Sequence, residues 1–180
     1  MKAYITSIGE KTLNLCKWSL ERNGFDVEVI EGDNSLAEKL KTIYEKADSD
    51  FLRVDADVIP NRNITPDFLS TFTDKEIWWL QFQTFDWCKQ DNTYGGVQFI
   101  RKEALPYLRE NINNHLNASR PESEMSRIKE FYDPRRFISV QIVTGLHNYK
   151  NDTKRVIKTK SRRGQMNNYD FELAQRIDEL

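Results

Sequence analysis

The sequence has few of the features that mark a secreted or membrane-bound protein. Only two of its 180 residues are cysteines, Cys16 and Cys88, and their positions suggest no metal-binding motif, which fits a reducing compartment. No apolar run approaches the roughly 18 residues that a membrane span needs, and the opening stretch M-K-A-Y-I-T-S-I-G is too short for a signal peptide. We therefore expect a cytoplasmic protein without a membrane span.

An excess of charge of one sign is also missing. The chain carries 27 Lys and Arg against 28 Asp and Glu, a formal net charge of -1, so nothing attracts it as a whole to nucleic acid or to a membrane. Repeats, low-complexity tracts and linkers are absent as well, and 180 residues fit one domain. A composition of 38% hydrophobic and 31% charged residues is typical of a soluble globular protein.

What the sequence does have is an alternation of strands and helices. Apolar residues with spacing typical of strands occupy residues 3–8 and 25–30. Helical spacing follows each of them, over residues 13–22 and from a cap at Asn34 or Ser35 to about residue 47. A third strand begins at residue 50. This order predicts a parallel or mixed α/β sheet, in which ligands bind beyond the carboxyl ends of the strands.

The third strand contains two aspartates separated by one residue. Residues 50–60 read D-F-L-R-V-D-A-D-V-I-P, and residues two apart in an extended chain point to the same side, so Asp55 and Asp57 are expected to converge while Ala56 turns away. Two such carboxylates repel unless a cation or a shared proton lies between them, and oxygen ligands favour Mg²⁺ or Mn²⁺. The alternative is a strand end with two solvated aspartates, because D-x-D alone is a weak motif.

The rest of the chain adds two candidate functional features, a glycine pair and a histidine. Tyr94-Gly95-Gly96 predicts a tight turn that opens a strand, where paired glycines let a ligand come close or simply form a hairpin. His147 is expected in a loop after the last strand, as a ligand or as a surface histidine. The remaining expected elements are strands over residues 77–85, 97–101 and 138–143 and helices over residues 66–72, 102–111, 121–131 and 169–177.

With this element order, the D-x-D motif, Y-G-G-V-Q-F-I-R at residues 94–101 and G-L-H-N-Y at residues 145–149, the chain resembles glycosyltransferases of the GT-A fold. The resemblance covers roughly residues 2–150. It implies an α/β fold: one Rossmann-like GT-A domain over residues 1–150, with a mixed, mostly parallel sheet flanked by helices. Residues 151–180 would form a basic tail and a short helix packed on that domain. The chain is short for this family, which leaves little room for a separate acceptor-binding region.

The resemblance also implies an activity: transfer of a sugar from a nucleotide-diphosphate sugar, with a UDP-sugar as the first expectation, to a hydroxyl acceptor. Asp55, Asp57 and His147 would hold Mn²⁺ or Mg²⁺, and this metal would neutralise the charge that builds up on the departing diphosphate. Gly95 and Gly96 would wall the sugar pocket. The residues expected to contact the donor are Thr6, Ser7, Ile8, Glu31, Asp33, Arg53, Asp55, Ala56, Asp57, Gly95 and Gly96.

The acceptor side is less constrained. An inverting enzyme needs a carboxylate to deprotonate the acceptor hydroxyl, and the candidates are Glu124, Glu122 and Asp86, in that order. Glu122 and Glu124 are equally explained as acidic residues in the first turn of a helix. The basic run Lys154–Arg163 is either solvated or faces an anion, which could be the donor diphosphate or DNA carrying hydroxylated bases.

Three other functions fit parts of the same pattern. A haloacid-dehalogenase-type phosphatase also carries D-x-D after an apolar strand, although that motif usually sits on the first strand and here two β-α units precede it. A nuclease or topoisomerase-like metal domain would use V-I-E-G-D and D-A-D, but the spacing between them is short for it. The third alternative is a protein that binds a nucleotide sugar without catalysis. Turnover of a nucleotide sugar with a divalent metal discriminates among all of these.

Overall fold

The computed structural model describes residues 1–74, 76–117 and 136–148, which belong to one compact unit, Met1–Tyr149. Glu122 and Glu124 with their helix, the basic run Lys154–Arg163 and the expected C-terminal helix lie outside the described residues. Among the helices that the structure describes, none has the length and apolar character needed to cross a membrane.

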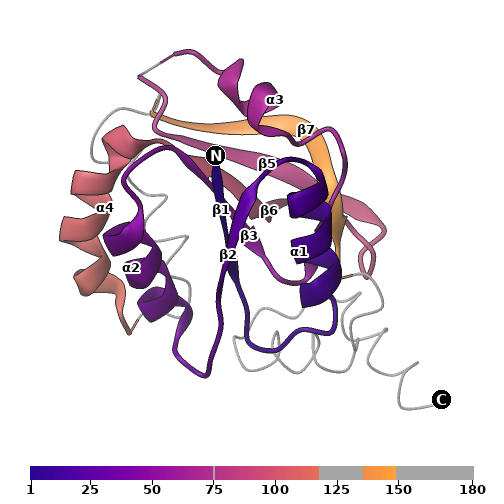
Figure 1. The fold of residues 1–180 in the computed structure, drawn as a ribbon, viewed down its shortest axis with the longest axis horizontal. Helices are drawn as coiled ribbons and strands as arrows, with labels where there is room; N and C mark the ends of the chain where they lie inside the picture. Colours follow the sequence, from indigo (N-terminus) through magenta and orange to yellow (C-terminus); the bar gives the residue numbers. More distant parts are fainter. Residues whose placement is uncertain (75, 118–135, 149–180) are drawn as a thin grey trace. The chain divides into compact units, whose positions relative to one another are not determined.

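A seven-stranded mixed sheet forms the centre of the unit, in the order β2-β1-β3-β6-β5-β7-β4 (Figure 1). β1, β2, β3, β5 and β7 run in one direction, and β6 and β4 run in the other, so five of the seven strands are parallel to one another. This confirms the predicted α/β class with a mixed, mostly parallel sheet. The strands are β1 (Lys2–Thr6), β2 (Asp26–Ile30), β3 (Phe51–Asp55), β4 (Val58–Pro60), β5 (Trp79–Asp86), β6 (Asp91–Ile100) and β7 (Phe137–His147).

Helices cover both faces of this sheet, because alternate strand residues point to opposite sides and both sides are apolar. Leu52 of β3 packs with α1 and α3 on one face, and the neighbouring Phe51 packs with α2 and α4 on the other (Figure 1). The helices are α1 (Leu13–Arg22), α2 (Leu36–Lys46), α3 (Pro66–Ser70) and α4 (Leu105–Asn111), and the short 3₁₀ turns are η1 (Lys102–Ala104) and η2 (Ile112–His115).

The helix signals in the first half of the sequence are confirmed. α1 has the predicted bounds. α2 begins after Ser35, whose hydroxyl accepts a hydrogen bond from the Glu38 N–H at 3.2 Å, while the Glu38 carboxylate accepts one from the Ser35 N–H at 2.8 Å. This reciprocal pair satisfies two amide groups that the first helical turn leaves open.

The predicted extended course of residues 50–60 is wrong. β3 ends at Asp55, the chain turns at Ala56 and Asp57, and β4 then pairs with β7 instead of continuing β3. Ala56 and Val58 are both fully buried, so the apolar run continues through the turn and conceals it. Asp55 and Asp57 therefore do not share a side of one strand.

The predicted tight turn at Tyr94-Gly95-Gly96 is also wrong, because these residues lie within β6. The chain reverses earlier, between β5 and β6, at residues 87–90. Gly95 and Gly96 have φ angles of +127° and +77°, and the register of the β5–β6 pair shifts at Gln81 and Gln83 opposite them. Residues with a side chain rarely adopt such positive φ angles, so the two glycines permit this irregularity inside the strand.

The last strand is longer than predicted. β7 extends to His147, so this histidine is the final residue of a strand and not part of a loop. Its extension pairs with β4, and Val58 lies opposite His147 in that register.

Candidate functional site

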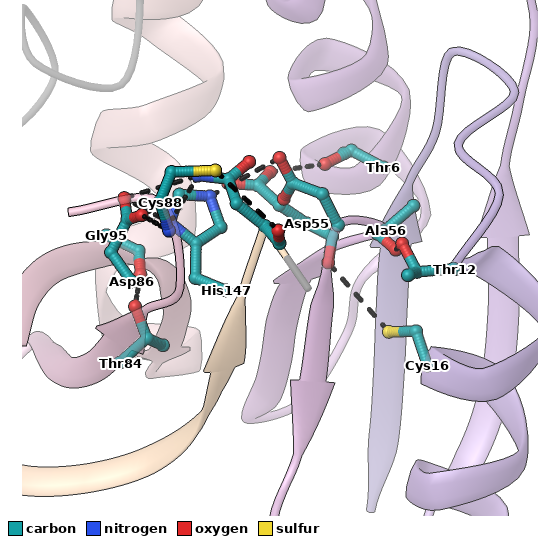
Figure 2. A network of polar contacts seen from close by, with 12 residues as sticks. Thr6, Thr12, Cys16, Asp55, Ala56, Thr84, Asp86, Cys88, Gly95 and His147 are labelled. Carbon is teal, nitrogen blue, oxygen red and sulfur yellow. Dashed lines mark hydrogen bonds and ion pairs between the residues drawn. The ribbon is translucent and has the colours of Figure 1, made fainter. Parts of the chain in front are cut away.

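Polar side chains gather where four strands that run in the same direction end. Thr6 closes β1, Asp55 closes β3, Asp86 closes β5 and His147 closes β7. The carboxyl ends of parallel strands lie at one edge of the sheet, which is where open α/β folds bind ligands. Figure 2 shows His147 beside Asp86, and Asp55 in contact with Thr6.

The turn that carries the aspartates forms backbone hydrogen bonds with three other segments of the chain. The Ala56 N–H donates to the Thr6 carbonyl at 3.0 Å, and the Thr12 hydroxyl donates to the Ala56 carbonyl at 2.8 Å (Figure 2). The Asn148 N–H donates to the Asp57 carbonyl at 3.0 Å. The backbone positions of both aspartates are therefore fixed by the surrounding fold.

Asp55 is paired with a buried arginine. Arg53, whose side chain is 1% exposed, donates to Asp55 Oδ1 and, at 3.0 Å, to Gln98 Oε1. The Thr6 hydroxyl also donates to Asp55 Oδ1, at 2.9 Å. A β-carbon added at Gly96 would lie 3.6 Å from Asp55 Oδ2, so this second oxygen faces the glycine segment of β6. The guanidinium of Arg53 thus compensates the charge of Asp55.

Asp57 is paired with His147. The distance between Asp57 Oδ2 and His147 Nε2 is 3.3 Å. The other oxygen, Asp57 Oδ1, is buried and has no hydrogen-bond partner in the part of the chain that the structure describes. The structure therefore brings together two of the three expected metal ligands, residues that are distant in sequence.

Asp86 contacts the other nitrogen of the same ring. Its Oδ2 lies 3.3 Å from His147 Nδ1 and accepts a hydrogen bond from the Asn148 side-chain amide at 3.2 Å. Its Oδ1 accepts hydrogen bonds from the N–H groups of Cys88 and Lys89 at 2.9 and 3.1 Å. The His147 imidazole thus lies between two carboxylates.

These carboxylates determine the charge of the ring. Burial alone would lower the pKa of His147, but hydrogen bonds and charges from Asp57 and Asp86 outweigh it and raise the pKa to about 10. Burial would raise the pKa of Asp86, but the hydrogen bond and charge of His147 outweigh it and the pKa is lowered. Without another cation at the site, His147 is therefore protonated at neutral pH.

The donor chemistry of this site fits a divalent metal at Asp57 and His147. Carboxylate oxygen and imidazole nitrogen are common ligands of Mn²⁺, and Mg²⁺ is usually held by one or two carboxylates together with substrate phosphates. The buried Asp57 Oδ1 is an acceptor that a cation would satisfy. Among residues 1–74, 76–117 and 136–148, however, no group of three or more His, Cys, Asp or Glu side chains is arranged to hold a metal.

The predicted nucleotide-binding residues lie at the ends of β1 and β2. Ser7 is buried, and both its hydroxyl and the Ile8 N–H donate to Glu10 Oε2 at 2.8 Å. Ile8 itself is 59% exposed. Glu31 and Asp33 are exposed in the turn after β2. The accessible predicted residues at this edge are therefore Ile8, Glu31 and Asp33, whereas the side chains of Thr6 and Ser7 are buried.

Sequence reasoning missed a buried cation beneath the loop after β1. Lys39 of α2 is 2% exposed, and its ammonium donates to the Ser7 carbonyl at 2.5 Å. Burial lowers the pKa of Lys39. Its position three residues after Leu36 and four before Ile43 places it on the apolar face of the helix, which was the available signal.

Asn148 was also missed. It is buried, and its φ of +58° is unusual for a residue other than glycine, although asparagine tolerates this region better than most. Because its side chain contacts Asp86 and its backbone contacts Asp57, it links the two carboxylates that flank His147. No local sequence pattern identifies such a residue.

Comparisons with known proteins place the fold but not the family. No protein-family profile and no curated protein sequence matches the chain. Among solved structures, a glycosyltransferase involved in the glycosylation of the major capsid of PBCV-1 is similar, with a TM-score of 0.60 and 15% identity over 88% of this chain and 98% of that one.

Two nucleotidyltransferase structures are similar at lower scores. The 4-diphosphocytidyl-2C-methyl-D-erythritol synthase of Anaerococcus prevotii has a TM-score of 0.52 and 10% identity over 91% of this chain and 95% of that one. A candidate glucose-1-phosphate thymidylyltransferase from Bacillus anthracis has a TM-score of 0.53 and 12% identity over 93% and 96%. The chain therefore has a fold that glycosyltransferases and nucleotidyltransferases share.

Proposed function

We propose that this protein is a glycosyltransferase that moves a sugar from a nucleotide-diphosphate sugar to a hydroxyl acceptor, with a UDP-sugar as the first donor to test. The observation that carries the proposal is the contact between Asp57 of the D-x-D motif and His147, at the ligand-binding edge of a fold shared with a glycosyltransferase. The loops after β1 and β2 supply accessible contacts for a nucleoside at the same edge.

A divalent ion, Mn²⁺ or Mg²⁺, belongs to this proposal. Asp57 and His147 would hold it, with Asp55 beside them, and it would supply a positive charge to the departing nucleoside diphosphate. Arg53 holds the Asp55 carboxylate, and Asn148 holds the backbone of Asp57. Gly95 borders the sugar pocket in this proposal, whereas the space beside Gly96 is filled by Val58, whose Cγ2 lies 2.7 Å from where a β-carbon would be. Holding the diphosphate in one geometry lowers the entropic part of the barrier.

Release of nucleoside diphosphate tests the proposal. The protein is incubated with a panel of nucleotide sugars in Mn²⁺, in Mg²⁺ and in chelator, and with nucleoside triphosphates plus sugar 1-phosphates. Without an added acceptor, water receives the sugar, and we expect metal-dependent release of nucleoside diphosphate and free sugar from one nucleotide sugar, lost in Asp57→Asn and retained in Asp26→Asn. Asp26 is an exposed control at the start of β2, at the opposite end of the parallel strands.

The alternative with specific support is nucleotidyl transfer, because two similar structures have names of that class. It would produce pyrophosphate from a nucleoside triphosphate, not nucleoside diphosphate from a nucleotide sugar. Release of pyrophosphate would therefore favour nucleotidyl transfer over glycosyl transfer. If neither product forms, both proposed activities are wrong.

For the acceptor, we propose that the basic run Lys154–Arg163 contacts an anion, either the donor diphosphate or DNA that carries hydroxylated bases. Transfer to such DNA, and its binding as a function of salt, are compared between the native protein and Arg162→Ala/Arg163→Ala. Weaker DNA binding in the double variant supports a DNA acceptor, whereas loss of donor affinity alone assigns the run to the diphosphate. For the catalytic base that deprotonates the acceptor hydroxyl, Glu124 is the first candidate and Glu122 the second.

A further inference from the structure

The geometry around Asp86 points to a role that differs from that of a catalytic base. We propose that Asp86 is a positioning residue: it holds the His147 imidazole by Nδ1, so that Nε2 is presented at Asp57, where the metal and the donor diphosphate bind. The inference rests on the proposed function for the identity of that ligand. The orientation of the ring itself rests only on its contacts with Asp57 and Asp86, each at 3.3 Å.

Asp86 has no lone pair left to take a proton from an acceptor hydroxyl. A carboxylate offers about four acceptor positions. Oδ1 accepts from the N–H groups of Cys88 and Lys89, and Oδ2 accepts from the Asn148 amide and lies 3.3 Å from His147 Nδ1. The side chain is only 3% exposed, so an acceptor hydroxyl cannot reach it without displacing one of these groups.

Asp86 also determines which nitrogen of the His147 ring carries a proton. Among the residues that the structure describes, two groups approach this nitrogen, Asp86 Oδ2 and the Asn148 amide nitrogen, both at 3.3 Å. The amide nitrogen can only donate, so Asp86 is the one neighbour of the two that accepts the Nδ1 proton. An unprotonated Nδ1 would instead turn its lone pair toward a carboxylate. With Nδ1–H held in this way, Nε2 is the nitrogen available to a cation.

Asp86 is in turn held by Asn148, a residue with a positive φ. Asn148 has a φ of +58°, a conformation that residues other than glycine rarely adopt and that persists where surrounding contacts hold it. In that conformation its amide donates to Asp86 while its backbone N–H donates to the Asp57 carbonyl. Asn148 thereby fixes the position of Asp86, which orients His147, relative to Asp57, which would hold the metal together with His147.

Asp86→Asn tests the proposal. Asparagine keeps an oxygen for the N–H groups of Cys88 and Lys89 but turns an NH₂ group toward His147 Nδ1 and the Asn148 amide, so donors face donors. We expect the Kd for Mn²⁺, measured by titration without nucleotide, to rise 10- to 100-fold, as is usual when a residue behind a metal ligand is lost. The circular dichroism spectrum should stay native, and Asp26→Asn should bind Mn²⁺ like the native protein.

A catalytic base would give a different result. Asp86→Asn would then lower kcat for transfer and leave the Kd for Mn²⁺ and the KM for the donor unchanged, which would overturn the proposal. If Asp86→Asn does not fold, Asn148→Gly replaces it. Glycine adopts the positive φ without strain and removes only the side-chain amide, so we expect a native fold with weaker Mn²⁺ binding. Native Mn²⁺ affinity in Asn148→Gly would also contradict the proposal.

A second readout needs neither metal nor turnover. The chain has two histidines, so the NMR spectrum of histidine-labelled protein contains one signal set from His147 and one from His115 as an internal reference. We expect a slowly exchanging Nδ1 proton on His147 that disappears in Asp86→Asn, with His115 unchanged. If that proton exchanges equally fast in both proteins, the proposal fails. A native protein that shows this proton but turns over no nucleotide sugar would remove the proposed function and leave the role of Asp86 intact.

Discussion

At the residue scale, the two aspartates of the D-x-D motif are not equivalent. Asp55 has its own cation, because the buried guanidinium of Arg53 donates to Oδ1. Asp57 has only His147, and its Oδ1 is buried without a partner among the described residues. Asp55 is thus held mainly by the protein itself, whereas Asp57 is the carboxylate with an acceptor still to satisfy.

Arg53→Met should reveal this difference as a loss of stability. The substitution removes the cation beside Asp55 and the hydrogen bond that Arg53 donates to Gln98 Oε1. We expect the free energy of unfolding to fall by about 1.5–3 kcal/mol in urea titrations, the scale for loss of a hydrogen bond to a charged group, because the Asp55 side chain is 32% exposed. The double variant Arg53→Met/Asp55→Asn should recover part of that loss, because the unpaired charge is gone. A single-variant loss below about 0.5 kcal/mol would show that Arg53 does not compensate Asp55.

The stability of the metal-free protein should depend on pH through His147. Its pKa is raised to about 10, above its ordinary value of 6.5 in the unfolded chain. The ring therefore contributes its full stabilisation below pH 6.5 and loses it as the pH rises toward 10. Since each tenfold change in proton affinity is about 1.4 kcal/mol, the loss is at most about 5 kcal/mol.

The measurement is urea unfolding in chelator at several pH values, with His147→Gln as the comparison. The difference in unfolding free energy between the two proteins should shrink steadily from pH 6.5 to pH 10. A difference that stays constant over this range would mean that His147 is not held as a cation between Asp57 and Asp86.

At the element scale, the pairing of β4 with β7 assembles the site. The register sets Val58 opposite His147, and Asp57 immediately precedes Val58, so the aspartate and the histidine meet at one end of this ladder. Gly145 lies opposite Pro60 in the same register. A β-carbon there would be 2.8 Å from the Ile59 carbonyl oxygen and 2.9 Å from Val58 Cγ1. The close approach of β4 to β7 therefore depends on the missing side chain of Gly145.

Gly145→Ala should push these strands apart. We expect a stability loss of about 1–3 kcal/mol, because the added carbon meets backbone that cannot yield easily. Mn²⁺ binding should weaken at the same time, because the contact between Asp57 and His147 opens. Ile142→Ala, at a partly exposed position of the same strand, is the control. Native stability in Gly145→Ala would contradict the close packing of β4 on β7.

Much of the element pattern could be predicted from the sequence. The bounds of α1, the Ser35 cap of α2 and the mixed sheet follow from local spacing and capping residues, which act within a few positions. The turn at Ala56 and Asp57 could not be predicted, because its flanking residues are buried and read as a continuous strand. The strand position of Gly95 and Gly96 depends on the register against β5, which no local pattern contains.

Only part of the candidate site could be predicted from the sequence. The meeting of Asp57 and His147 was expected from the resemblance to a known fold, and the structure places them 3.3 Å apart. Lys39 and Asn148 were not expected, since each acquires its role from a segment that is remote in sequence. Local signals thus identify residue types, while the sheet order decides which of them meet.

At the scale of the whole molecule, the site lies at the edge where parallel strands end, on a chain whose formal net charge is -1. Such a chain does not attract a dianionic donor over long distances, so binding must depend on local cations. In the metal-free protein, the protonated His147 ring is the cation between Asp57 and Asp86. A metal held by Asp57 and His147 Nε2 would supply positive charge in place of the Nε2 proton. Metal binding should therefore release a proton and strengthen as the pH rises.

The central claim is that Asp57 and His147 together hold a metal that binds the diphosphate of the donor. Calorimetric titration of UDP, the part shared by all UDP-sugars, tests it in Mn²⁺ and in chelator. We predict that UDP binds only with Mn²⁺, that Asp57→Asn and His147→Gln each abolish this binding, and that Asp26→Asn leaves it unchanged. Binding of UDP that is equally tight in chelator, or in Asp57→Asn with Mn²⁺, would contradict the claim.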